Sequence, residues 1–180
     1  MRSLDIFALA LVAVVSPALG QQSPYVEYQG RPIKALSAEL VVAYLAGDGM
    51  GFALAAELNG YPGPRHVLQL ADSLSLDATQ HAEVAAIFDR MRAHAQVLGA
   101  AVVTQEQTLD SLFAEGTITA ERLKSLLADI ATLQGELRAA HLAAHLTLLD
   151  VLSKHQIQEY QRLRGYAAQG HEHNRRGRAK

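Results

Sequence analysis

The chain has 180 residues, no cysteine, no tryptophan and a formal net charge of −2. This length suits a single domain, and the lack of cysteine excludes disulfide bonds, zinc–thiolate sites and thiol catalysis. Residues 21–170 carry 11 basic and 16 acidic side chains, a net charge of −5, so this part of the chain is a poor match for nucleic acid.

Residues 1–20 are predicted to be a secretory signal peptide. Arg2 precedes an apolar run from Ile6 to Val15, and small residues stand two apart at Ala18 and Gly20. The run is too short for an ordinary transmembrane helix. An acidic residue before the run is unusual in a signal peptide, and an uncleaved anchor is the alternative. No cysteine follows, which excludes a lipoprotein anchor.

Residues 21–64 are predicted to form an N-terminal extension with short helices. Scattered Pro and Gly in 21–36 favour an extended arm, and Ser37 is a suitable N-cap for a first helix. A glycine-rich break at 47–51 precedes a second helical pattern over 52–58. The glycine spacing resembles a phosphate-binding loop, but no strand precedes it, so a flexible break is expected.

A dense turn signal, Asn59-Gly60-Tyr61-Pro62-Gly63-Pro64, comes next. Pro64 suits the first position of a helix, and a short helix is predicted over 65–74. The extension is therefore expected to end at a turn, and the main helical domain to begin at residue 65.

Residues 65–166 are predicted to contain a long antiparallel helical hairpin. Apolar residues recur at heptad spacing at positions 84, 88, 91, 95, 98, 102, 109 and 112. After a turn near Gly116 the spacing repeats at positions 123, 127, 130, 134, 137, 141, 144, 148 and 151. Two long helices joined by a short turn lie antiparallel, which places His141 opposite Met91. The predicted fold is all-α, a long hairpin with short flanking helices.

The hairpin is bracketed by two matching pentapeptides, each with a leucine, an N-cap residue and a glutamine three positions after the cap. In this arrangement the cap side chain accepts from the backbone N–H of the glutamine, and the glutamine side chain returns to the N–H of the cap. Loss of either cap is expected to cost about 1 kcal/mol. The six residues are Leu76, Asp77 and Gln80 in the first pentapeptide, and Leu152, Ser153 and Gln156 in the second.

With these two pentapeptides on a helical hairpin, residues 65–166 resemble the Spy/CpxP/ZraP family of periplasmic proteins, which is related to CnrX-type heavy-metal sensors. The resemblance implies an exported periplasmic protein, often a homodimer, that takes part in the envelope stress response. Such proteins hold partly unfolded envelope proteins, bind a membrane stress-sensor protein, or sense and buffer metal ions.

Two departures from the family pattern matter. The well-known chaperone members have a basic cradle, whereas this body is acidic. The CnrX-type sensors take His ligands from the first helix, a Glu from the second and a His/Met pair from the third. Here Phe88 stands about where that Glu falls, and His141 and His145 stand approximately where the pair does. The full ligand set of the sensors is therefore absent from the predicted positions.

His141 and His145 are candidate metal ligands because residues four apart project from the same side of a helix. Two imidazoles at this spacing suit zinc, nickel or copper, with His66, His94 or Met91 as further ligands. The alternative is that His141 is a hydrogen-bonded polar residue in an apolar stripe and His145 a flanking residue, since no acidic residue accompanies the pair.

Residues 167–180 are predicted to be a disordered His/Arg tail. His171 and His173 are candidate low-affinity ligands for Zn, Cu or Ni ions, although neighbouring arginines repel a dication. Only Met50 and Met91 follow the signal peptide, which disfavours a methionine-rich copper(I) protein.

Three functions remain open from the sequence. The leading expectation is a chaperone-type protein that needs no cofactor. The second is a metal sensor or buffer that uses the histidines. The third is a structural protein on a membrane or partner surface, although an acidic body disfavours strong membrane binding. No nucleophile–base or acid–base pattern stands out, and narrow hairpins offer few pockets, so the chain is expected not to be an enzyme.

Overall fold

The computed structural model describes residues 22–166. They belong to two compact units whose boundary falls between Gly30 and Arg31. The first unit contains one 3₁₀ helix, η1 (Val26–Gly30), whose residues are mostly exposed. In the second unit, Ile33 and Leu36 are buried. The prediction of an extended arm over 21–36 is therefore wrong. Pro and Gly interrupt any regular apolar spacing in this segment, but they prevent neither a short 3₁₀ helix nor the burial of single side chains.

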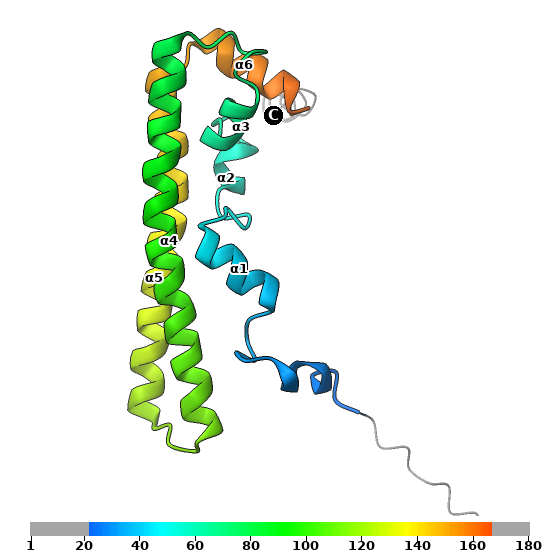
Figure 1. Ribbon diagram of the computed structural model, residues 1–180, viewed down its shortest axis with the longest axis vertical. Helices are drawn as coiled ribbons and strands as arrows, with labels where there is room; N and C mark the ends of the chain where they lie inside the picture. The colour runs from blue at the N-terminus through cyan, green and yellow to red at the C-terminus, as the bar shows by residue number, and fades with distance from the viewer. Residues whose placement is uncertain (1–21, 167–180) are drawn as a thin grey trace, which may run out of the picture. The chain divides into compact units, whose positions relative to one another are not determined.

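The second unit is built on two long helices, α4 (Ala78–Ala114) and α5 (Ala120–Val151), which run antiparallel side by side (Figure 1). The turn between them contains Gly116 at φ 68°, a conformation that glycine adopts without strain. The described residues contain no strand. The predicted all-α class and the hairpin are confirmed.

The buried stripes of the hairpin follow the predicted positions over most of their length. At two places the neighbouring residue is the more buried one: Leu126 is fully buried in place of Leu127, which is 49% exposed, and Ile87 is more buried than Phe88. An α-helix has 3.6 residues per turn, so a strict 3.5-residue repeat drifts around a straight helix. The drift explains why the errors fall toward the ends of the predicted stripes.

Three short helices lie along one side of the hairpin (Figure 1): α1 (Ala38–Ala46), α2 (Leu54–Glu57) and α3 (Pro64–Gln69). Ser37 caps α1 by accepting from Leu40 N–H, as predicted. Helix α3 begins at Pro64, as predicted, but ends five residues before the predicted Leu74. The chain turns instead, and Ser75 has a positive φ of 49°. Residues 31–64 thus share one compact unit with the hairpin.

Helix α1 approaches α4 closely at Gly99. A Cβ built on Gly99 would lie 2.8 Å from the carbonyl carbon of Tyr44 and closer still to its oxygen. Only glycine permits this separation of the two backbones. The contact brings buried Tyr44 into the same apolar cluster as Ala95 and Leu98.

Two apolar clusters fill the second unit. One surrounds Val67, Val84, Leu148 and Tyr160, at the end of the hairpin where its helices start and finish. The other surrounds Tyr44, Val102 and Leu137, nearer the middle. Along α5, His141 stands between the two clusters, so its position interrupts an otherwise apolar interior.

Both predicted capping boxes are present. Asp77 caps α4 and Ser153 caps the last helix, α6 (Lys154–Leu163), and in each box the glutamine side chain accepts from the N–H of the cap. The two glutamines also bind each other: Gln80 Nε2 donates to Gln156 Oε1 at 3.0 Å, and Gln156 Nε2 donates to Gln80 Oε1 at 2.9 Å.

The second hydrogen of each amide donates to a backbone carbonyl across the junction. Gln80 Nε2 reaches Val151 O at 2.9 Å, and Gln156 Nε2 reaches Leu74 O at 3.3 Å. Every donor of the two amides is therefore used, and each Oε1 accepts twice. The paired amides join the start of α4 to the start of α6.

We expect the two glutamines to be energetically coupled. In a double-mutant cycle, Gln80→Ala and Gln156→Ala should each lower the free energy of unfolding by about 2 kcal/mol, because each leaves buried polar groups without partners. The coupling energy should be about 1 kcal/mol. Chemical denaturation followed by circular dichroism measures both values. Exposed Gln107 on α4 serves as control, and additive losses at Gln80 and Gln156 would contradict the pairing.

Within residues 22–166, no helix is both long enough and apolar enough to cross a bilayer.

Candidate functional site

A hollow of about 300 Å³ lies between the hairpin and the segment that joins α1 to α3. We call it the histidine hollow. The glycine loop Gly47–Gly51 contributes one wall, and Phe88 and Met91 of α4 contribute another. His141 and His145 line it from α5. Met91 and His141 share this hollow, in agreement with the predicted hairpin register.

His141 is the most unusual side chain of the hollow. It is 4% exposed, and its ring packs near that of Phe52 at 6.0 Å between centroids. Its Nε2 is the one fully buried side-chain nitrogen or oxygen within residues 22–166 that has no hydrogen-bond partner. Burial lowers the pKa of His141, with the nearby His145 acting in the same direction and Asp48 opposing. The imidazole is therefore held neutral.

The depressed pKa of His141 predicts an acid-sensitive fold. In the unfolded chain this imidazole takes up a proton near its ordinary pKa of about 6.5, whereas the folded chain resists the proton until lower pH. The contribution of His141 to stability is therefore complete above the unfolded-state pKa. It falls as the pH drops below that value, because the unfolded state then binds more protons than the folded state. Unfolding measured between pH 7.5 and pH 5 should show this loss. His141→Phe should make the free energy of unfolding depend less steeply on pH over this range. An unchanged pH dependence would contradict the role of His141 in the acid sensitivity.

His145 is held in one tautomer by the backbone. Its Nδ1 lies 2.8 Å from Tyr61 O, and because a carbonyl only accepts, Nδ1 carries the hydrogen. In the neutral form of this ring, Nε2 then carries no hydrogen. A Cβ on Gly63 would lie 2.9 Å from Cε1 of this ring, so glycine is required for the turn to pass His145.

Glu57 of α2 is a buried carboxylate that joins three helices. Its Oε1 accepts from Tyr160 Oη at 2.5 Å, from Tyr166 Oη at 3.1 Å and from Arg164 Nε at 3.2 Å. Its Oε2 lies 3.9 Å from His145 Nδ1 on α5. Burial and the bond to Glu57 raise the pKa of Tyr160 far above its ordinary value, so the phenol stays protonated.

Glu57 was missed in the sequence, where the histidine pair was described as having no acid nearby. That description is wrong, because Glu57 reaches His145 through the tertiary fold. The one available signal is that Glu57 interrupts the apolar run Phe52-Ala53-Leu54-Ala55-Ala56. An acidic side chain that follows such a run is a candidate for burial with a partner.

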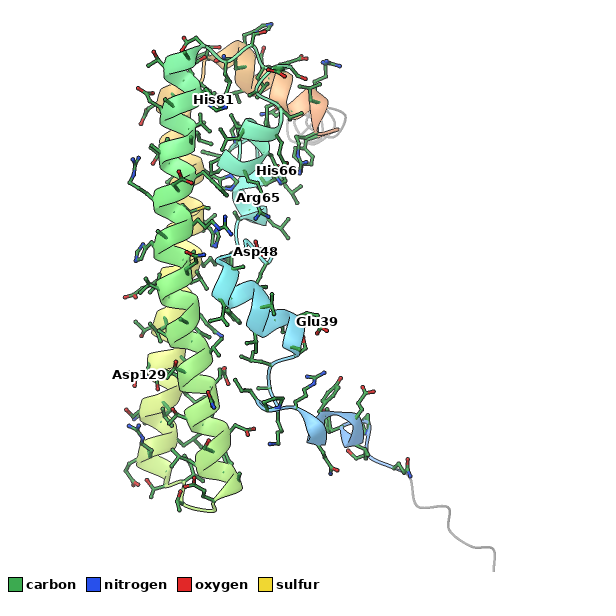
Figure 2. All side chains as sticks on the ribbon, in the orientation of Figure 1. Glu39, Asp48, Arg65, His66, His81 and Asp129 are labelled. Atoms are coloured by element: carbon green, nitrogen blue, oxygen red, sulfur yellow. The ribbon has the colours of Figure 1, made fainter. Side chains whose placement is uncertain are left out.

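Of the further predicted ligands, Met91 and His66 line the hollow and His94 does not. The Nδ1 of His66 lies 2.9 Å from Gln69 Oε1, whereas His94 is exposed. Figure 2 shows Asp48, Arg65 and His66 along the α1–α3 side, with Arg65 NH2 3.0 Å from Asp48 Oδ1. The tail residues His171 and His173 lie outside the described residues.

Among residues 22–166, no group of three or more His, Asp or Glu side chains lies close enough together to hold one metal ion. The hollow is lined by three imidazoles, those of His66, His141 and His145, and by the carboxylate of Glu57. This carboxylate is committed to Tyr160, Tyr166 and Arg164. The hollow itself depends on residues 47–66, which supply one side of it and which a bare hairpin lacks.

Comparison with protein-family models, with curated proteins and with solved structures gave no match to this chain. The resemblance to the Spy/CpxP family therefore depends on the two pentapeptides and the hairpin, and it stays a prediction.

Proposed function

We propose that this chain is an exported, Spy/CpxP-like protein of the periplasm that binds partly unfolded proteins. The hairpin, with one capping box before its first helix and one after its second, supports the resemblance. The observation that carries the proposed activity is a concentration of exposed apolar side chains on α1 and α2.

These side chains form the outer apolar set, Val42, Leu45, Leu54 and Leu58, each between 49% and 65% exposed. Val42 and Leu45 stand three residues apart on α1, on the side away from buried Tyr44. Leu54 and Leu58 stand four apart and share one side of α2. Exposed apolar surface concentrated in this way marks interaction sites on soluble proteins, and extended apolar segments of unfolding clients supply matching surface.

The charge of the chain narrows the class of client. Residues 21–170 carry a net charge of −5, so association with basic clients is favoured and association with acidic clients is opposed. Electrostatic steering of this kind weakens as salt rises. The proposed clients are therefore neutral or basic proteins that expose apolar segments.

Site-specific photo-crosslinking tests the proposed surface. A benzophenone amino acid at position 42 or 45 should crosslink a basic client during its unfolding, and should not crosslink the folded client. Ala86 and Ala139, exposed on α4 and α5, serve as matched positions. Equal crosslinking at all four positions, or none at 42 and 45, would reject α1 as the contact surface.

Metal capture is a second candidate function, favoured by the unpartnered Nε2 of His141 and the bare Nε2 of His145. Imidazole nitrogens without hydrogens are ligands for zinc, nickel and copper. Two such ligands are fewer than a tight structural site requires, so a third must come from solvent, the tail or a second copy of the chain.

Calorimetric titration with zinc and copper(II), with and without residues 167–180, separates the two sources of ligands. Micromolar binding that survives the truncation and is lost in His141→Ala/His145→Ala would assign the hollow as the site. Binding that disappears with the tail would assign it to His171 and His173, and no binding would remove this candidate.

A further inference from the structure

The histidine hollow has the size and walls of a site for one small ring. Its volume of about 300 Å³ is at the lower end of the range for ligand pockets. Met50, Leu54, Phe88 and Met91 supply apolar walls. Thioether sulfurs make favourable contacts with aromatic rings. The guanidinium of Arg65 lies over the Phe88 ring at 6.0 Å from its centroid, which leaves the ring edge to a second ring.

The charges around the hollow favour an uncharged occupant. Arg65 is paired with Asp48 at 3.0 Å, and Glu57 is paired with Arg164 at 3.2 Å and bonded to two tyrosine hydroxyls. Each fixed charge in the wall therefore already has a partner of opposite sign. A charged ligand entering this space would lose hydration and find no free countercharge.

One polar group of the hollow lacks a partner. His141 Nε2 is buried and makes no hydrogen bond, and such a group costs free energy until a donor or acceptor reaches it. A hydroxyl both donates and accepts, so it satisfies a neutral imidazole in either tautomer. A ring that carries a hydroxyl thus matches both the apolar walls and the unpartnered nitrogen.

We propose that the histidine hollow binds a phenol ring, with the ring between Met50, Phe88 and Met91 and the hydroxyl on His141 Nε2. The phenol is either a free small molecule or the side chain of a tyrosine. This inference goes beyond the proposed client binding and does not depend on it.

A ligand reaches His141 Nε2 only if part of the surrounding wall moves, because this atom has no exposed surface. The glycine loop is one of the walls of the hollow. The loop is suited to movement: Gly47, Met50 and Gly51 all have positive φ, at 67°, 41° and 80°. A non-glycine residue at positive φ is held by its surroundings rather than by its own preference. Rearrangement of Met50 therefore relieves an unfavourable conformation while it admits the ring.

The chain provides a direct test, because it contains three methionines, Met1, Met50 and Met91. With ¹³C-labelled methionine methyl groups, two of three NMR signals report on the hollow. Titration of the full chain with p-cresol should shift both Met50 and Met91 signals saturably, through the ring current of the ligand. Toluene, which lacks the hydroxyl, should bind the same place about five- to tenfold more weakly. Equal affinities, or shifts that do not saturate at both methionines, would overturn the proposal.

His141→Phe provides the matched variant, because it keeps a ring of similar size and removes the nitrogen. In this variant toluene should still bind, and p-cresol should bind about as tightly as toluene. If p-cresol still binds more tightly than toluene, the role of His141 is overturned. The comparison of the two ligands on the unaltered chain stands by itself if the variant does not fold.

Two peptides identify the source of the ring. Binding of Ala-Ala-Tyr-Ala-Ala at Met50 and Met91, tighter than that of its Phe twin, would support a tyrosine side chain as the ligand. Binding of p-cresol alone would support a free phenol. Client crosslinking at positions 42 and 45 is measured separately, so failure at the hollow leaves the proposed client surface tested on its own.

Discussion

Gly99→Ala is expected to lower the free energy of unfolding by about 3 kcal/mol, at the upper end of the cost of overpacking a core. The added Cβ would lie 2.8 Å from the carbonyl carbon of Tyr44, and the obstacle is backbone rather than a flexible side chain. Helix α1 must therefore move away from α4, which opens the cluster around Tyr44, Leu98 and Val102. Chemical denaturation followed by circular dichroism measures the loss.

Gly135→Ala is the matched control, and its expected effect has the opposite sign. Gly135 is exposed within α5, and a Cβ there would meet nothing within 4 Å. Alanine is favoured over glycine in a helix by about 0.5–1 kcal/mol, so this variant should be stabilised. Similar behaviour of the two variants would contradict the close approach of α1 to α4.

Glu57→Ala should cost about 3 kcal/mol, because removal of one partner from a buried ionic network leaves the others unsatisfied. The buried hydroxyl of Tyr160 loses its acceptor, and Arg164 loses its carboxylate. Glu57→Gln should cost less, about 1 kcal/mol, since the amide oxygen still accepts from Tyr160 and half-exposed Arg164 can recover water.

Glu83→Ala on the exposed face of α4 is the control for Glu57, and it should change stability by less than about 0.5 kcal/mol. Thermal and urea unfolding of the three variants give the comparison. Equal small losses for Glu57→Ala and Glu83→Ala would show that the carboxylate does not join α2 to α6.

Local signals predicted the elements that depend on neighbouring residues in the chain. Ser37, Asp77 and Ser153 were recognisable as caps because the cap and its partner N–H are three residues apart. The hairpin, and the presence of Met91 and His141 at the same level of it, followed from two apolar stripes and a short turn. Heptad spacing was less reliable for single residues, as the exchange of Leu127 for Leu126 shows.

The site could not be predicted in the same way, because its contacts join distant parts of the chain. Glu57 and Tyr160 are 103 residues apart, and Gln80 and Gln156 are 76 apart. The sequence identified each glutamine in its own box, but nothing local indicated that the two would bind each other. Likewise, the need for glycine at position 99, in the middle of a long helix, arises only from its contact with Tyr44 of α1.

The suppression of client aggregation tests the central proposal most directly. Light scattering of a basic client, unfolding with the chain at near-stoichiometric ratio, should rise later than without it. Replacement of Val42, Leu45 and Leu58 by serine should remove the delay, because these residues supply the exposed surface. Leu54 is kept because it also lines the hollow.

A control variant with serine at Val97, Leu127 and Leu146 matches that variant in residue type and exposure. These three side chains are 69%, 49% and 57% exposed, and Val42, Leu45 and Leu58 are 65%, 49% and 59% exposed. The control should retain the delay if α1 and α2 hold the client. No delay by the unaltered chain would contradict client binding itself, and equal loss in both variants would contradict the outer apolar set as its surface.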